Sequence, residues 1–137
     1  MEYDLTTQVK EFTAIEPAVY AAINVGSEIS TKGFESAVVI VNAGVLGTGT
    51  ADFQLDEADD DGSGSPDTFS AVADADLIGV ELDLRLLAAT DDGATKRMGY
   101  IGKKEWIRLS SIETVGFTSM IFGAVIVLGN PKRVPTT

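Results

Sequence analysis

The clearest pattern along the chain is an alternation of apolar and polar residues with a period of two. In residues 51–57 (ADFQLDE), Phe53 and Leu55 share one face, while acidic and amide side chains share the other. This period is typical of a β-strand with one buried face. Residues 80–87 (VELDLRLL) alternate in the same way and also predict a strand, although their leucines leave a helix as the alternative.

Apolar runs between turn residues predict further short strands. The β-branched run in residues 34–42 (FESAVVIVN) suits a strand that is buried on both faces. The glycines in residues 44–49 predict a flexible connection, and the residues from Asp59 to Asp67 predict an acidic loop. We expect the other strands in residues 19–30 with a bend at Gly26, and in residues 69–72, 96–101, 106–112 and 119–128, the last two joined by a hairpin at 113–118.

These elements predict an all-β fold. A chain of 137 residues matches the size of one domain, and about eight short strands without a long helix are typical of a sandwich. We therefore expect a two-sheet, jelly-roll-like sandwich over residues 17–137. Residues 1–16 have no clean period and precede Pro17, so they predict an extended N-terminal arm, with a short edge strand as the alternative.

Amino-acid composition restricts the possible classes of function more than the possible folds. The chain has no histidine and no cysteine, the side chains that most often shuttle protons, attack substrates or bind transition metals near neutral pH. We therefore expect a binding or structural protein and not an enzyme, with no catalytic residues, no cofactor and no metal. Without cysteine a disulfide-stapled secreted scaffold is excluded, and stability must come from burial and association.

Charge divides the chain into two unlike regions. Residues 51–92 carry thirteen acidic side chains and one basic side chain, Arg85, whereas residues 93–137 carry seven basic and two acidic ones. The two regions can neutralise each other within one fold. Alternatively, copies can dock head to tail, or the basic region can meet an acidic protein surface. The net charge of −11 disfavours nucleic acid as a partner.

Other sites fit the sequence less well. Glu57, Asp59, Asp61 and Gly62 imitate an EF-hand loop, but Thr68 stands where that loop requires a bidentate glutamate, so a solvated loop is the expectation and a weak calcium site the alternative. Nothing among the carboxylates selects a pair for glycoside hydrolysis. The apolar run in residues 117–128 is too short to span a bilayer as a helix, and residues 1–4 lack the basic start of a signal peptide.

Three segments resemble a known group of proteins. They are residues 33–39 (GFESAVV) with the turn at 42–44, the acidic stretch from Gln54 to Gly62, and residues 97–104 (RMGYIGKK), followed by an apolar strand and residues 129–133 (GNPKR). The chain resembles small structural proteins of tailed bacteriophages that decorate or cement the capsid. The resemblance implies a virion protein without enzymatic activity, located on the capsid exterior and, during assembly, in the host cytoplasm.

The partners implied are the major capsid protein and further copies of the chain as a homo-oligomer or lattice neighbours, without nucleic acid or membrane. A head-tail connector or tail component of the virion is the alternative, and a carbohydrate-binding sandwich around Trp106 is an alternative of another class. The arm and the basic region supply the candidate contact residues for capsid or subunit, which are Val9, Lys10, Phe12, Ile15, Lys103, Lys104, Lys132 and Arg133.

Overall fold

Two very long strands organise the molecule. The computed structural model describes residues 4–132, apart from the side chains of residues 113–115. Strand β4 (Phe34–Ala58) and strand β9 (Trp106–Pro131) pair antiparallel along their whole length, from Phe34 opposite Pro131 to Ala58 opposite Trp106. The all-β class predicted from the sequence is confirmed.

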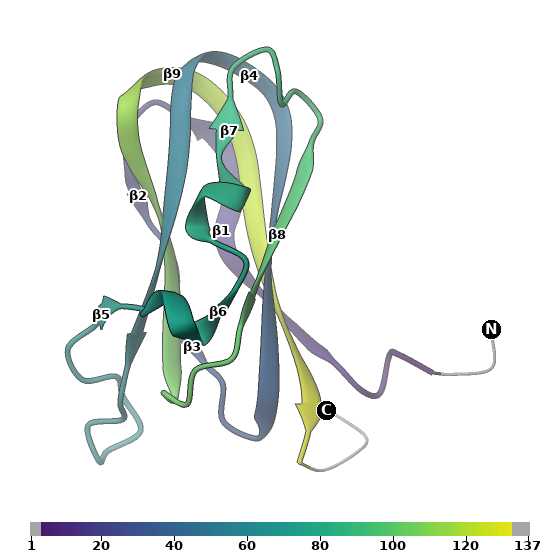
Figure 1. Ribbon diagram of the computed structural model, residues 1–137, viewed down its shortest axis with the longest axis vertical. Coiled ribbons are helices and arrows are strands. Elements are labelled where there is room, and N and C mark those ends of the chain that lie inside the picture. Colours follow the sequence, from purple (N-terminus) through teal and green to yellow (C-terminus); the bar gives the residue numbers. More distant parts are fainter. Residues whose placement is uncertain (1–3, 133–137) are drawn as a thin grey trace.

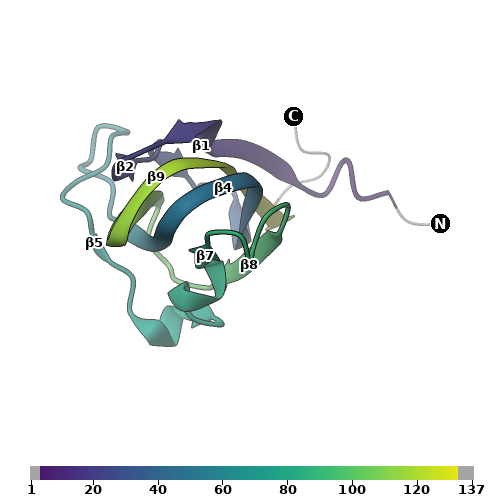
Figure 2. The same ribbon diagram turned by 90° about the horizontal axis from the view of Figure 1, so that it is seen from above.

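Both long strands bend near their middle and pass from one layer of the fold to the other. Figure 1 shows β4 and β9 rising together, arching over at one end and descending again. Figure 2, seen from above, shows the two arches side by side, with β1 and β8 on either side of them. The two layers of the sandwich are therefore halves of one continuous nine-stranded sheet, and the strands themselves join the layers.

Each half of the long pair has its own neighbours. The first layer has the order β1 (Lys10–Tyr20), β9, β4, β8 (Thr95–Tyr100) and β6 (Leu77–Ile78). In the second layer, β2 (Asn24–Val25) and β3 (Ile29–Ser30) pair with the first half of β9. On the other side of that layer, β5 (Ser70–Ala71) and β7 (Leu86–Leu87) pair with the second half of β4.

The bend corrects two expectations from the sequence. The glycines after Asn42 are not a flexible connection, because they lie inside β4, where the register shifts between Ala43 and Leu46 and again around Thr50. The hairpin expected at residues 113–118 is also wrong, because that segment continues β9 across the arch. Residues 113–118 pair with β4, and this pairing satisfies their backbone hydrogen-bonding groups without a hairpin turn.

The layers enclose one apolar core. Phe53 from the second layer meets Phe122 from the first edge to face, with ring centroids 5.3 Å apart. The alternation in residues 51–57 is confirmed, since Phe53 and Leu55 are buried and Gln54 and Asp56 are partly exposed. Asp52 departs from the pattern and is buried, because the Arg85 guanidinium donates two hydrogen bonds to its carboxylate, at 2.6 and 2.8 Å.

The strand predicted for residues 80–87 is wrong over its first half. Residues Glu81–Leu84 form a 3₁₀ helix, η2, and only Leu86–Leu87 form a strand. The backbone N–H of Val80 donates to the Asp83 carboxylate at 3.0 Å, and Gly79 before it has a φ of +94°. This local hydrogen bond favours a turn, and Leu82 therefore lies exposed while Leu84 is buried.

The N-terminal arm is shorter than expected. Residues 10–16 form the first half of β1, an edge strand that pairs with β9, so for them the edge-strand alternative is the one observed. Ala14 and Ile15 are fully buried, which explains why this segment packs onto the domain. Pro17 lies within the second of the two register shifts of β1, between Ile15 and Ala18, a position that an edge strand tolerates.

Helices contribute little to the part of the chain that the structure describes. The 3₁₀ helix η1 (Asp74–Asp76) precedes β6, and it and η2 are single turns. Within residues 4–132, neither has the length or the hydropathy to cross a bilayer.

Candidate functional site: a lysine-rimmed cleft

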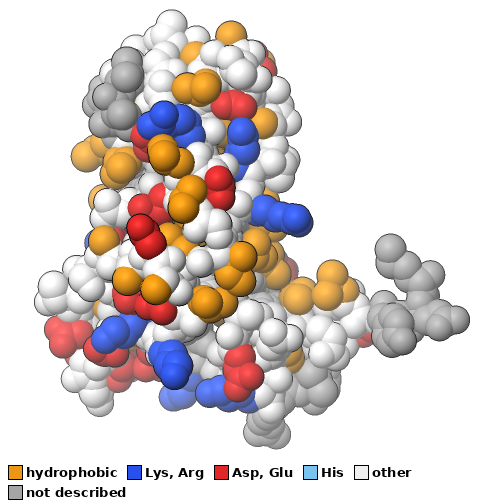
Figure 3. All heavy atoms as spheres, viewed as in Figure 1, with side chains coloured by type: hydrophobic (Ala, Val, Ile, Leu, Met, Phe, Trp, Pro, Cys, Tyr) orange, Lys and Arg blue, Asp and Glu red, His pale blue; other side chains and the backbone are white. Residues whose placement is uncertain are grey.

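A cleft of about 330 Å³ opens at the end of the molecule opposite the arches. We call it the basal cleft. Phe34, Ala37, Tyr100 and Ile101 supply its apolar wall, and the cleft is also lined by Lys103, Lys104 and Lys132, with Thr31 and Glu35 beside them. Three of the contact residues predicted from charge alone thus come together around one hollow. Figure 3 shows Lys and Arg side chains along this lower end of the molecule, with Asp and Glu side chains among them.

Backbone hydrogen bonds bring these distant segments together. The N–H of Thr31 donates to the carbonyl oxygen of Glu105 at 2.7 Å, and its hydroxyl donates to the carbonyl oxygens of Lys104 and Glu105 at 3.0 Å each. The N–H of Lys132 donates to the carbonyl oxygen of Gly33 at 2.8 Å. The turn between β3 and β4 therefore fixes both the β8–β9 connection and the end of β9.

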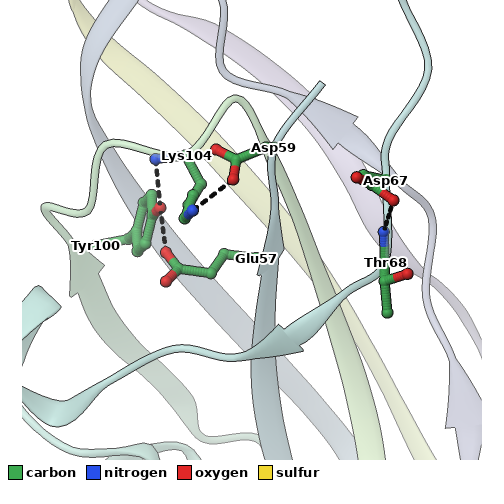
Figure 4. Close-up of polar contacts among 6 residues, drawn as sticks. All are labelled: Glu57, Asp59, Asp67, Thr68, Tyr100 and Lys104. Carbon is green, nitrogen blue, oxygen red and sulfur yellow. Dashed lines mark hydrogen bonds and ion pairs between the residues drawn. The ribbon is translucent and has the colours of Figure 1, made fainter. Parts of the chain in front are cut away.

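A buried polar pair supports the floor of the cleft (Figure 4). The Tyr100 hydroxyl donates to the Glu57 carboxylate at 2.7 Å and accepts a hydrogen bond from the N–H of Lys104 at 3.3 Å. Burial raises the pKa of the Tyr100 hydroxyl, and the hydrogen bond to Glu57 raises it further. Tyr100 therefore keeps its proton, and the pair anchors the lysine-bearing connection to β4.

The lysines of the cleft differ in their partners. The Lys104 ammonium forms an ion pair with Asp59 at 2.5 Å, which raises its pKa (Figure 4). Lys103 and Lys132 are exposed, and neither ammonium has a carboxylate within ion-pair distance among the described residues. These two side chains are available to an acidic partner.

Most ion pairs join the acidic region of the chain to the basic one. Lys96 pairs with Asp91 at 3.0 Å, and Arg108 pairs with Asp56 at 3.6 Å, as Lys104 does with Asp59. The prediction that the two regions neutralise each other within one fold is therefore confirmed for these three basic side chains. It does not extend to Lys103 or Lys132.

Carboxylates of the acidic loop accept hydrogen bonds from the backbone of the same loop. The N–H groups of Gly62 and Ser63 donate to Asp60 and Asp61 at 2.9 and 2.7 Å, and a backbone bridge joins Asp60 to Pro66. Asp67 accepts from the N–H of Thr68, apart from the cleft network (Figure 4). No group of three or more acidic side chains within the described residues is arranged to hold a metal ion.

Of the remaining predicted contact residues, the four that the structure describes do not line the cleft. Ile15 is 1% exposed, so its prediction as a surface contact is wrong, because the first half of β1 packs into the core. Phe12 is half-buried against the core, and the Lys10 ammonium lies 5.5 Å from the centre of its ring. Val9 precedes β1, and Arg133 lies outside the described residues.

Sequence reasoning missed the Glu57–Tyr100 pair. A signal for it was present, because Glu57 continues the odd-numbered face of Phe53 and Leu55 and therefore points inward. Trp106 behaves as its position predicted: it lies on the less buried side of β9, and its indole N–H donates to Asp60 at 3.3 Å.

Comparisons with known proteins concern the fold. No family model and no curated protein sequence matches the chain. A solved structure, the crystal structure of SPBc2 prophage-derived protein YomS, is similar with a TM-score of 0.50 and 12% sequence identity, covering 88% of this chain and 93% of that one. This architecture therefore also occurs in a protein encoded by a prophage.

Proposed function

We propose that the protein is a structural component of a bacteriophage virion that decorates the capsid, binding the outside of the major capsid shell through the basal cleft. The observation that carries the proposal is the concentration of Lys103, Lys104 and Lys132 around one hollow of a molecule whose net charge is −11. The three lysines give this end a local positive charge on an acidic molecule, which favours one orientation on an acidic shell.

The cleft has the composition of a protein contact. Phe34, Tyr100 and Ile101 supply apolar area, and Lys103 and Lys132 supply positive charge beside it. A hollow of this size accommodates a few side chains of a partner. The shell component that fits has an acidic loop with an apolar residue beside its carboxylates.

The scaffold behind the cleft suits a protein that clamps neighbouring subunits. The long β4–β9 pair runs continuously through both layers, so force applied at the basal end is distributed over the backbone hydrogen bonds of the whole sheet. Such a protein needs no enzymatic activity. The likeness in fold to the prophage-derived protein YomS supports the viral part of the proposal.

Quantitative binding to capsids tests the proposal. Expanded capsids of the virus that encodes the chain, assembled without it, are incubated with the purified protein and separated on a gradient. Decoration predicts on the order of hundreds of bound copies per particle, whereas a connector at one vertex predicts about six or twelve, as closed ring symmetry requires. Absence of binding, or ring-like stoichiometry, would refute decoration.

Charge reversal locates the contact. The double variant Lys103→Glu/Lys132→Glu should weaken capsid binding at least about tenfold, because it places like charges at the contact. The matched control Lys103→Arg/Lys132→Arg keeps both charges and should bind nearly as well as the wild type. Equal binding by all three proteins would remove the basal cleft from the interface.

A further inference from the structure

The outer face of the first layer carries apolar side chains on β1, β9 and β4, interrupted where Asn42 lies opposite Gly123. In the register of the sheet, Ile40 lies opposite Val125, Val38 opposite Val127, and Val19 opposite Ile121. Val125 and Ile121 are 37% and 39% exposed and Val19 is 62% exposed, while the other three are half-buried. We call this set the outer stripe, and its members on adjacent strands are in side-chain contact distance.

A shallow groove of about 370 Å³ runs along the stripe. It is lined by Ile40, Ile121 and Val125 together with Thr13 and Pro17 of β1. The groove forms where β1 shifts register twice, between Thr13 and Ile15 and again before Ala18. An apolar groove on a sheet face is typical of a surface that another apolar surface covers.

Opposite charges flank the stripe on its two sides. Glu11 of β1 lies opposite Val127, and Arg97 of β8 lies opposite Ile40. Both side chains are exposed, and neither has an ion-pair partner among the residues that the structure describes. The strands that carry them are three strand spacings apart, about 14 Å, with the apolar strands β9 and β4 between them.

We infer that the outer stripe binds a second copy of this chain across a two-fold axis parallel to the strands. Such an axis between β4 and β9 places β9 of one copy over β4 of the other, so that Val125 packs on the partner's Ile40 and Val127 on the partner's Val38. The same operation places β1 over the partner's β8. Glu11 and Arg97 of the partner subunit then face each other with an offset of two residues along the strand direction, about 7 Å.

The charge pattern argues for a second copy and against an unlike partner. A surface with a negative flank and a positive flank is complementary to itself after a two-fold rotation, and the rotation forms the Glu11–Arg97 contact twice. A partner whose surface carried one sign of charge would meet one of the two flanks with like charge. The two ion pairs also set the register of two copies that otherwise repel each other through a net charge of −11 each.

Sedimentation of the full chain and its variants tests this inference. The wild type should form a dimer. Arg97→Glu and Glu11→Arg should each raise the dissociation constant about tenfold or more, because each places like charges at both contacts. The double variant Glu11→Arg/Arg97→Glu should return to within about threefold of the wild type, because the charges are exchanged and the contacts restored.

Two further variants complete the test. Lys103→Glu changes the net charge as Arg97→Glu does, but at the basal cleft, and should leave the dimer unchanged. Val125→Asp should abolish the dimer while the β-type circular dichroism spectrum persists, because the side chain is on the surface. A monomeric wild type, a double variant as dissociated as the single ones, or a dimer that survives Val125→Asp would each overturn the inference. None of these outcomes depends on capsid binding.

Discussion

Asp52, Glu57 and Glu81 each bring a carboxylate against the core, and each has a different partner. Asp52 accepts from the guanidinium of Arg85, Glu57 from the hydroxyl of Tyr100, and Glu81 from the backbone N–H of Leu55 at 2.9 Å. A buried carboxylate is tolerated only when such donors replace water. At the residue scale, the acidic half of the chain is therefore partly structural and not only a source of solubility.

Glu81 gives a prediction about pH. Burial raises the pKa of its carboxyl above the ordinary 4.5, the N–H of Leu55 opposes this, and Asp74 and Asp56 add to the rise. The native state thus binds the proton of the Glu81 carboxyl more tightly than the unfolded state does. The contribution of Glu81 to the free energy of unfolding is therefore largest at low pH and falls as pH rises from about 4.5 through the native pKa. Glu81→Gln keeps the acceptor oxygen and should raise Tm by about 2 °C or more at neutral pH.

Thermal unfolding at neutral pH and near pH 5 checks this prediction, and the advantage of Glu81→Gln should shrink at the lower pH. Glu81→Ala is the matched control. It leaves the buried N–H of Leu55 without its acceptor and should cost about 1–3 kcal/mol at both pH values. A lower Tm for Glu81→Gln at neutral pH would show that the ionised carboxylate stabilises the fold.

At the scale of elements, the arch of β4 and β9 decides the architecture. Gly49 has a φ of +93°, and a Cβ at this position would lie 2.3 Å from the carbonyl oxygen of Gly116 in the neighbouring strand. The close approach lets both strands turn together while their pairing continues. A side chain here would have to separate the two backbones.

Gly49→Ala should therefore destabilise the protein for two reasons, the positive φ of Gly49 and the clash of the new Cβ with β9. The control is Gly33→Ala, which has nearly the same φ, +90°, but nothing within 4 Å of its Cβ. We expect about 1–2 kcal/mol for Gly33→Ala and a larger loss, about 3 kcal/mol or more, for Gly49→Ala. Urea unfolding measures both, and equal losses would mean that the arch has room for a side chain.

At the scale of the whole molecule, β1 closes one edge of the sheet and completes the core. Asp4 accepts hydrogen bonds from Thr6 and Thr7 beside it in the chain, whereas Ala14 and Ile15 are buried in the core. Deleting residues 1–8 should leave Tm nearly unchanged. Deleting residues 1–16 should cost several kcal/mol, since burial of Ile15 alone contributes about 1.5–3 kcal/mol, and should expose the edge of β9 to aggregation.

Urea unfolding and light scattering of the two truncated proteins check this prediction. A stable, monodisperse protein without residues 1–16 would show that they form a dispensable arm, as the sequence suggested. Capsid binding by the protein without residues 1–8 would separate a contribution of the N-terminal segment from that of the basal cleft.

The sequence by itself determined the all-β class, the inward face of residues 51–57, the acidic loop and the unequal division of charge. Its prediction that residues 34–42 are buried on both faces is wrong, because Val39 and Val41 are buried whereas Val38 and Ile40 are half-buried on the outer face of the first layer. Each of the features that it determined follows from local periodicity or composition, which short-range sterics and burial convert directly into strands and turns. Only the tertiary structure decided that β4 and β9 cross both layers, that residues 81–84 turn instead of extending, and that Lys103, Lys104 and Lys132 share one cleft. The crossing of β4 and β9 and the grouping of the three lysines depend on contacts between residues about 30 to 100 positions apart, and a pattern with a period of two carries no information about which distant segments meet. The turn at residues 81–84 depends instead on a local hydrogen bond, from the N–H of Val80 to the Asp83 carboxylate, which competes with the extended conformation that the pattern predicts.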